Sequence, residues 1–120
     1  MYINKNNIEI GIDIEEIIRF NIYVKNIIYA QRIFTKEEIS YAMSKKYKIA
    51  QYFTAFFAAK EAVWKALNNH YTKLLITDIA IQHNKIGKPI VYIKSQHYDN
   101  IDISLSHTKS YVVAVAIVCY

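Results

Sequence analysis

The stretch from about Tyr47 to Asn68 repeats its apolar side chains at the period of an α-helix, and it is the longest such stretch in the 120-residue chain. With about 100° between successive residues, its large apolar side chains fall in one narrow sector. They are Ile49, Phe53, Phe56, Val63 and Leu67. A helix with such a face needs a surface to cover it, so we expect a domain built around this helix.

Three charged residues break the apolar pattern of the helix. Lys60 falls near the middle of the apolar sector, whereas Glu61 and Lys65 lie together on another side, among small residues. Small side chains permit the close approach of another backbone or of a ligand. Taken alone, Glu61 and Lys65 form an ordinary i, i+4 surface pair, and Lys60 can bury its stem and extend its ammonium group to water. The small residues are Thr54, Ala58 and Ala62.

Two patterns before the long helix have the spacing of a capping box. Residues 8–12 alternate apolar with other side chains, as in a short strand. Asp13 follows, with Glu16 three residues later, so we expect the strand to pass into a helix at Asp13. Thr35 and Glu38 have the same spacing and predict a second helix to about residue 44.

The second half of the chain predicts strands. Alternation begins at Leu75, a polar loop follows at 83–88, and a further apolar run begins at Pro89, which together indicate a hairpin. Two more strands are expected at 101–106 and 111–120. The last is apolar on both faces, which is expected only where both faces are covered. A domain this small has few layers to offer, so a neighbouring subunit is a candidate cover. We expect an α+β fold, with the long helix packed against a small antiparallel sheet, in an oligomer.

Length and composition favour a single domain over residues 1–120, since the chain is 53% hydrophobic and has no Pro- or Gly-rich linker. No apolar run approaches the roughly 18 residues that cross a bilayer, and the first residues lack a secretory pattern. The single cysteine, Cys119, cannot form an internal disulfide. We therefore expect a cytoplasmic protein without a membrane partner, in which Cys119 is a buried small hydrophobe.

A formal charge of +5 favours an anionic partner, which leaves nucleic acid, an acidic protein and a phosphorylated small molecule open. The lysines are scattered, and no run of five basic residues appears, which argues against a DNA-binding arm. The 11 tyrosines could stack on bases, but half-buried aromatic residues explain most of them, so nucleic-acid binding is the weaker hypothesis.

Four short segments, in this order, resemble the 4′-phosphopantetheinyl transferase superfamily over nearly the whole chain. The single-length chain, with its histidine segment near the end, is similar to the holo-acyl-carrier-protein synthase branch, whose members form trimers. The segments are Gly11-Ile12-Asp13-Ile14 followed by Arg19, then residues 57–66 (FAAKEAVWKA), then Gly87-Lys88-Pro89, then Ser104-Leu105-Ser106-His107.

The resemblance implies transfer of 4′-phosphopantetheine from coenzyme A to a serine of an apo acyl carrier protein, with Mg²⁺ required and adenosine 3′,5′-bisphosphate released. By position, Asp13 and Glu61 would be metal ligands, and Lys65 would contact the phosphates. Glu61 could also be the catalytic base. Two carboxylates with substrate phosphates are a ligand set that suits Mg²⁺. The carrier could belong to fatty-acid, polyketide or peptide synthesis; fatty acid biosynthesis is the usual setting of this branch.

Other residues receive peripheral roles from the same resemblance. Arg19 would lie on the helix that faces the carrier protein, and His107 near the nucleotide end of coenzyme A. Lys60 is expected to pass the apolar face and reach a phosphate or a backbone carbonyl. Glu15 is a weaker candidate ligand, because helical geometry after Asp13 would aim it elsewhere. A basic rim for the carrier or the 3′-phosphate, or simply a solvated face, is formed by Lys25, Arg32, Lys45, Lys46 and Lys48.

The chain departs from the family pattern at three places. Glu9 stands where a glycine is usual, Phe56 where an arginine is common, and residues 68–71 (NNHY) replace a glycine-rich turn. Asparagine replaces glycine only partly where backbone must approach a ligand. A catalytically degenerate homologue that binds coenzyme A or the carrier protein is therefore the alternative function.

Overall fold

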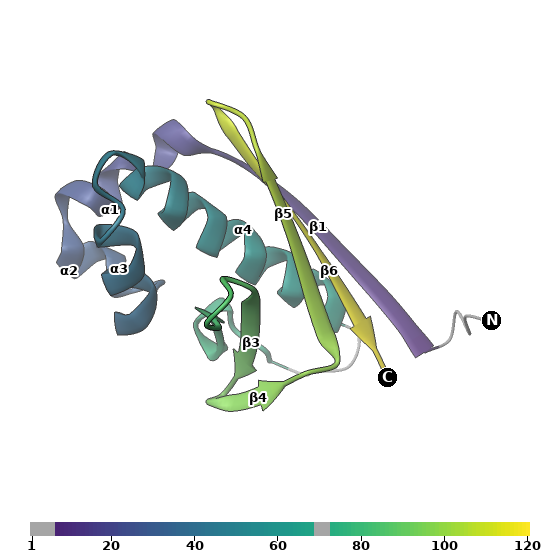
Figure 1. Ribbon diagram of the computed structural model, residues 1–120. Coiled ribbons are helices and arrows are strands. Elements are labelled where there is room, and N and C mark those ends of the chain that lie inside the picture. Colours follow the sequence, from purple (N-terminus) through teal and green to yellow (C-terminus); the bar gives the residue numbers. More distant parts are fainter. Residues whose placement is uncertain (1–6, 69–72) are drawn as a thin grey trace.

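The computed structural model describes residues 7–68 and 73–120, and it shows one long helix lying across an antiparallel sheet (Figure 1). The α+β class and the long helix are thus as the sequence predicts. The elements in chain order are β1 (Ile8–Glu16), η2 (Ile17–Phe20), α1 (Asn21–Lys25), α2 (Ile27–Ala30), α3 (Lys36–Met43), η3 (Lys46–Lys48), α4 (Ile49–Leu67), η4 (Ile76–Asp78), β2 (Ile79–His83), β3 (Pro89–Ile93), β4 (Gln96–Tyr98), β5 (Ile101–His107) and β6 (Tyr111–Cys119), where η marks a 3₁₀ helix.

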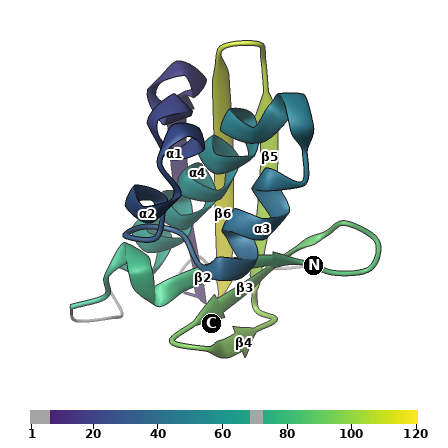
Figure 2. The ribbon, with the colours of Figure 1, turned by 90° about the vertical axis from the view of Figure 1, so that its left-hand side faces the viewer.

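The strands of the described residues form two sheets rather than the single sheet expected. One has the order β1-β6-β5 and the other β2-β3-β4, and every pairing is antiparallel. The first and last strands of the chain are therefore neighbours. Figure 2 shows α1 and α2 on one side of α4 and α3 on the other.

The helix α4 packs most closely on β1 and β6, and its small residues make this possible. A Cβ atom placed on Gly11 would lie 1.9 Å from the backbone oxygen of Ala62 and 2.8 Å from the backbone nitrogen of Ala66. Only a glycine lets the backbone of β1 come this close. The small side of the helix therefore accommodates another backbone, which is one of the two occupants that the sequence left open.

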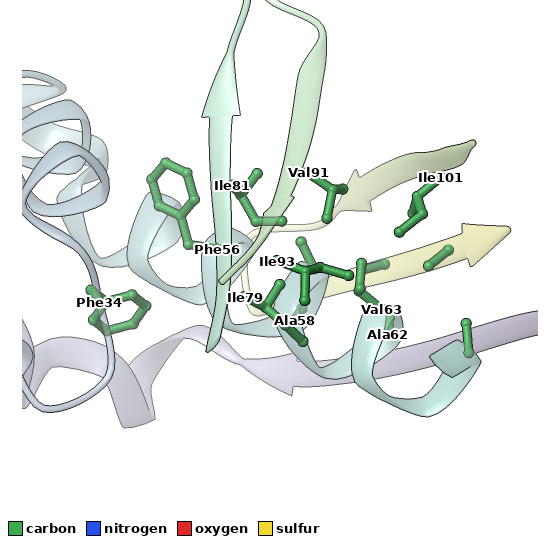
Figure 3. Packing of buried hydrophobic residues seen from close by; sticks show 14 of the residues in the cluster. Phe34, Phe56, Ala58, Ala62, Val63, Ile79, Ile81, Val91, Ile93 and Ile101 are labelled. Carbon is green, nitrogen blue, oxygen red and sulfur yellow. The ribbon is translucent and has the colours of Figure 1, made fainter. Parts of the chain in front are cut away.

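The other sides of α4 bury the large apolar side chains. Val63 lies near Ile79, Ile93 and Ile101 of the strands, as Figure 3 shows, and each of these side chains is at most 5% exposed. These residues belong to one core that the helices and both sheets share. No helix among the described residues is long and apolar enough to span a bilayer.

The strand β1 is longer than the sequence predicts. It does not end at Asp13 but pairs with β6 as far as Glu16, with Asp13 opposite Ala114 and Glu15 opposite Val112. The expected helix N-cap at Asp13 is therefore wrong, because pairing with β6 prevails over the local capping preference. The Thr35 capping box is confirmed, since the Glu38 backbone N–H donates to the Thr35 hydroxyl at 3.1 Å.

Three further differences concern the second half of the chain. Residues 76–78 form the 3₁₀ helix η4 instead of the start of a strand, and the short strand β4 at 96–98 has no clear sequence signal. The hairpin of β2 and β3 and the final pair of β5 and β6 are confirmed. Cys119 is exposed rather than buried, because it lies on the same outer face of β6 as Ile117, whereas its neighbour Val118 points to the buried side.

One face of the first sheet has no layer over it among the described residues of the chain. The side chains of Ile10, Ile12 and Ile14 on β1 are 67%, 61% and 61% exposed, and Ile117 on β6 is 41% exposed. This is the face opposite α4, because the neighbouring residue Gly11 points toward the helix. The sequence-based expectation that both faces of the last strand are covered is thus met on the α4 side within the described residues, and a neighbouring subunit over the other face stays a prediction.

Candidate active site

Strand geometry brings two carboxylates to the side of β1 that faces α4. Alternate residues of a strand share a face, so Asp13 and Glu15 point the same way as Gly11, which touches the helix. Our expectation that Glu15 is aimed elsewhere is wrong, because it rested on a helix at this position. The side chains of Asp13 and Glu15 are only 10% and 12% exposed.

The helix contributes Glu61 and Lys65 to the same place. The Lys65 ammonium donates to the backbone oxygen of Ile12 at 2.9 Å and to Oδ1 of Asp13 at 3.3 Å. Its side chain remains 47% exposed, so the ammonium group is also accessible to a ligand from solvent. The pair Glu61 and Lys65 is thus not an isolated surface pair, because Lys65 connects α4 to the strand.

Burial and neighbouring negative charge raise the pKa of both glutamates of the cluster. Burial raises the pKa of Glu15 to about 7, aided by its hydrogen bond with Asp13 and by the negative charges of Asp13 and Glu61, while Arg19 opposes the shift. Burial also raises the pKa of Glu61, as does the charge of Asp13, and Lys65 opposes them. The cluster holds more negative charge than Lys65 neutralises, so a further cation at this place would be stabilised.

The donor set fits a Mg²⁺ ion that shares its coordination with a substrate. Oδ2 of Asp13 is buried and has no hydrogen-bond partner among the described residues, so one hard oxygen ligand is free. Within the described residues, no three His, Cys, Asp or Glu side chains are grouped closely enough to hold a metal by themselves. Mg²⁺ in such sites usually takes one or two carboxylates and completes its shell with water and phosphate oxygens.

Two other predicted site residues lie near the ends of strands of the first sheet, Arg19 beyond β1 and His107 on β5. Arg19 in η2 has a side chain that is 70% exposed, with Nη1 3.7 Å from Oε1 of Glu15. His107 ends β5 and is exposed; its Nδ1 lies 3.4 Å from the backbone oxygen of Thr108. It pairs with Val112, which also pairs with Glu15, so His107 and Glu15 lie on one row of the sheet, roughly 10 Å apart.

A sequence model of the 4′-phosphopantetheinyl transferase superfamily matches residues 9–116. The chain belongs to this superfamily. The match includes β1, α4 and β5, the three elements that carry the carboxylate cluster, Lys65 and His107.

Individual members of the superfamily are similar along nearly their whole length. A holo-[acyl-carrier-protein] synthase of Clostridium tetani is 36% identical over 118 residues, covering 91% of this chain and 93% of that protein. The crystal structure of a holo-(acyl-carrier-protein) synthase from Bacillus anthracis in complex with CoA (3′,5′-ADP) has a TM-score of 0.75 and 31% identity, covering 92% and 95% of the two chains. The Helicobacter pylori enzyme in complex with coenzyme A gives a TM-score of 0.72 and 29% identity, over 91% and 98%.

Among the charged residues of segment 57–66, Lys60 is the one that the structure places away from the cluster. It is 1% exposed, and its ammonium group donates to the backbone oxygen of Ile33 at 2.7 Å and pairs with Glu38. Of the two partners expected for Lys60, the structure therefore shows the backbone carbonyl. Its position does not support our expectation that it contacts coenzyme A, because no part of the ammonium group faces solvent.

Sequence reasoning underrated two residues of this superfamily member. The period-2 pattern of residues 8–16 extends to Glu15 and Glu16, and it would have placed Glu15 beside Asp13 had the capping pattern not been preferred. The sequence pattern predicts only a helix-capping role for Glu38, whereas its carboxylate also forms an ion pair with Lys60. Of residues 68–71, which replace the glycine-rich sequence, all but Asn68 lie outside the described residues.

Proposed function

We propose that the protein is a holo-[acyl-carrier-protein] synthase, which transfers 4′-phosphopantetheine from coenzyme A to a serine of an apo acyl carrier protein and releases adenosine 3′,5′-bisphosphate. The observation that carries the proposal is the convergence of Asp13, Glu61 and Lys65 from β1 and α4, with a buried carboxylate oxygen of Asp13 that has no partner in the described part of the chain. The names of the similar proteins and the coenzyme A held by two of the similar structures support it.

Asp13 and Glu61 would hold Mg²⁺. When bound, the ion would offset the negative charge of the two carboxylates and of the pyrophosphate that is attacked. Lys65 already reaches into this place while half exposed, and its ammonium group can donate to a phosphate oxygen next to Asp13. Charge on the nonbridging and leaving oxygens is what must be neutralised in such a displacement.

The serine hydroxyl must lose a proton as it attacks phosphorus. Glu61 is the candidate base as well as a ligand, since its carboxylate lies in the cluster with Asp13 and Lys65, where the reacting hydroxyl would be held. Glu15 lies on the same face of β1 and contributes a further carboxylate. His107 is proposed to contact the nucleotide end of coenzyme A, since it is exposed and lies on the same row of the sheet as Glu15.

The carrier protein is proposed to bind at Arg19. Its guanidinium group is exposed and close to Glu15, so an acidic partner held there lies beside the carboxylate cluster. The formal charge of +5 favours encounter with such an acidic partner. The working environment is proposed to be the cytoplasm, and the pathway one that uses a carrier protein, such as fatty acid biosynthesis.

We further propose that the protein assembles as a trimer through the outer face of the first sheet. Ile10, Ile12 and Ile14 are each more than 60% exposed on one face of one strand, with Ile117 beside them. Burying such a face gains roughly 25 cal/mol for each Å² of apolar surface removed from water. A second and third copy of the chain can cover it, and they would bring their own elements close to the cluster on the opposite side of β1.

The decisive experiment incubates the protein with coenzyme A, Mg²⁺ and an apo carrier protein, with and without a chelator. The carrier should gain the mass of one phosphopantetheine group, and the chelator should prevent the gain. Glu61→Gln should abolish transfer while the protein stays folded, because the carboxylate is lost but the shape is kept. Full activity of this variant would remove Glu61 from the site.

Coenzyme A binding without transfer to any of several carriers would favour the alternative, a catalytically degenerate binding module. Calorimetric titration of the same preparation with coenzyme A separates the two cases. If neither binding nor transfer occurs, both versions of the proposal fail.

A further inference from the structure

Glu38 and Lys60 are the only charged side chains that are buried among the described residues. Their exposed fractions are 0% and 1%, and the Lys60 Nζ lies 2.6 Å from Oε1 of Glu38. Taking two charges out of water has a cost that often exceeds their mutual attraction, and an apolar pair of similar volume often serves stability as well. A buried pair is therefore weak evidence for a role in stability, and the proposed chemistry does not use it.

The pair connects four segments of the fold. Lys60 on α4 also donates to the backbone oxygen of Ile33 at 2.7 Å, in the segment before α3. Glu38 on α3 accepts from the backbone N–H of Thr35 at 2.9 Å and from that of Ile81 on β2 at 2.8 Å. Since β2 is an edge strand, the Ile81 N–H that faces away from the sheet needs this acceptor. The ammonium group of Lys60 is thus held in one direction by fixed partners.

The direction of Lys60 fixes the direction of its neighbour Glu61. Successive residues on an α-helix are about 100° apart, so with Lys60 turned toward α3, Glu61 turns toward β1. Lys65, one turn further, then reaches Asp13. Side-chain ends lie roughly 5–6 Å from the helix axis, so a rotation of about 20° would move the Glu61 carboxylate by about 2 Å.

Packing on the small side of α4 is close, but few side chains there interlock with the sheet. Beside Thr54, the residues of α4 that are buried on this side are mostly alanines, among them Ala58, Ala62 and Ala66, each at most 2% exposed. Alanine side chains permit close approach, but they form low ridges that interlock little with a neighbouring surface. A directional polar contact on another side of the helix can supply the missing constraint.

We propose that the buried Glu38–Lys60 pair is a positioning device for the active site, which sets the rotation of α4 and so holds Glu61 and Lys65 against Asp13. The catalytic consequence of this inference rests on the proposed function. The claim that the pair sets the rotation of α4 does not depend on that function. Glu38 and Lys60 are positioning residues, because neither touches the carboxylate cluster.

The test removes both charges together, so that neither is left unpaired in the core. The double variant Glu38→Gln with Lys60→Met keeps the side-chain volumes. Thr54→Val is the matched control, since it removes a buried polar contact of α4, from the Thr54 hydroxyl to the Ala50 backbone oxygen, that connects no other element. All proteins are compared at a temperature at which circular dichroism shows them folded.

Three readouts decide the outcome. Binding of Mn²⁺, measured by electron paramagnetic resonance in the presence of adenosine 3′,5′-bisphosphate, should weaken at least tenfold in the double variant and not in Thr54→Val. The kcat for transfer should fall, while the KM for the carrier protein stays unchanged. A crystal structure of the double variant should show the Lys65 ammonium out of hydrogen-bond reach of Ile12 and Asp13.

A double variant that is folded, less stable, and unchanged in Mn²⁺ affinity, kcat and the position of Lys65 would overturn the inference and leave a purely structural ion pair. If the unaltered protein neither binds Mn²⁺ nor transfers phosphopantetheine, the proposed function fails. The crystallographic comparison then still decides whether the pair sets the rotation of α4.

Discussion

Gly11→Ala tests whether the close packing of β1 on α4 is what builds the active site. The added Cβ would lie 1.9 Å from the Ala62 backbone oxygen and 2.9 Å from its carbonyl carbon, whereas ordinary contacts begin at 3.4 Å. The obstructing atoms are helix backbone and cannot rotate away. Strand and helix must therefore separate locally by roughly 1–1.5 Å, a distance that overpacked cores accommodate only by shifting backbone.

The expected cost of this separation has two parts. Overpacking destabilises by about 1–3 kcal/mol, which lowers Tm by roughly 4–12 °C for a domain of this size. Asp13 follows Gly11 by two residues and would move with it away from Lys65. In the unaltered protein, Oδ1 of Asp13 lies 3.3 Å from Nζ of Lys65. A misplacement of about 1 Å in a catalytic group can reduce the rate about 100-fold. We therefore expect a folded protein whose kcat/KM for transfer falls by about that factor.

The assay is transfer of phosphopantetheine to the carrier, followed by mass spectrometry well below the Tm of each variant. Val91→Ala is the control, because Val91 is fully buried in the second sheet, where a smaller side chain destabilises without moving β1 against α4. It should lose stability and keep its activity. If Gly11→Ala is as active as Val91→Ala at equal stability, the close approach of strand and helix does not build the site.

Lys65→Met should lower kcat/KM for transfer by at least about 100-fold. It should cost little stability, because the contacts of Lys65 are half exposed and such ion pairs contribute only about 0–1 kcal/mol. A loss of stability as large as that of Gly11→Ala would contradict this assignment. Ile12→Lys would bury a lysine at the centre of the proposed interface. Light scattering after gel filtration should therefore give the molar mass of one chain for this variant and of three chains for the unaltered protein. An unchanged molar mass would exclude this face as the interface. His83 stacks on Tyr41 with the ring centroids 4.1 Å apart, and burial, together with the charge of Lys45, lowers the pKa of its imidazole. Below about pH 6.5 the unfolded chain therefore binds the proton more readily than the folded one, and the free energy of unfolding decreases as the pH is lowered. His83→Phe keeps the stacking and should show a stability advantage that grows from pH 7.5 to pH 5 in urea unfolding; an equal advantage at both values would mean that protonation plays no part.

The sequence predicts the helices of the middle of the chain well because their signals are local. The Thr35 capping box and the apolar period of α4 involve residues a few positions apart, and the structure reproduces both. The end of β1 is set by a different kind of interaction. Asp13 to Glu16 are extended because β6, about a hundred residues later in the chain, supplies hydrogen-bond partners for them. A local pattern cannot report such a partner.

The candidate site shows the same division. Asp13, Glu61 and Lys65 could be named from their motifs, and the structure brings the three together. Glu15 could be placed only once the strand was known to continue, because a helix would have turned its side chain away from Asp13. Lys60 illustrates the reverse case. Its partner Glu38 is 22 positions away in sequence, and nothing in either segment announces the pair before the fold is known.

The continuation of β1 also joins the two proposed surfaces of the protein. Because alternate residues of a strand face opposite ways, Ile12 and Ile14 point outward while Gly11, Asp13 and Glu15 point toward α4. A shift of one residue in the pairing of β1 with β6 would exchange these sets, burying carboxylates in the proposed interface and placing isoleucines at the proposed metal site. Assembly that fixes the outer isoleucines would therefore also fix the register that holds Asp13 against Lys65, so loss of the trimer is expected to lower activity even if no residue of a neighbouring subunit contacts the substrate.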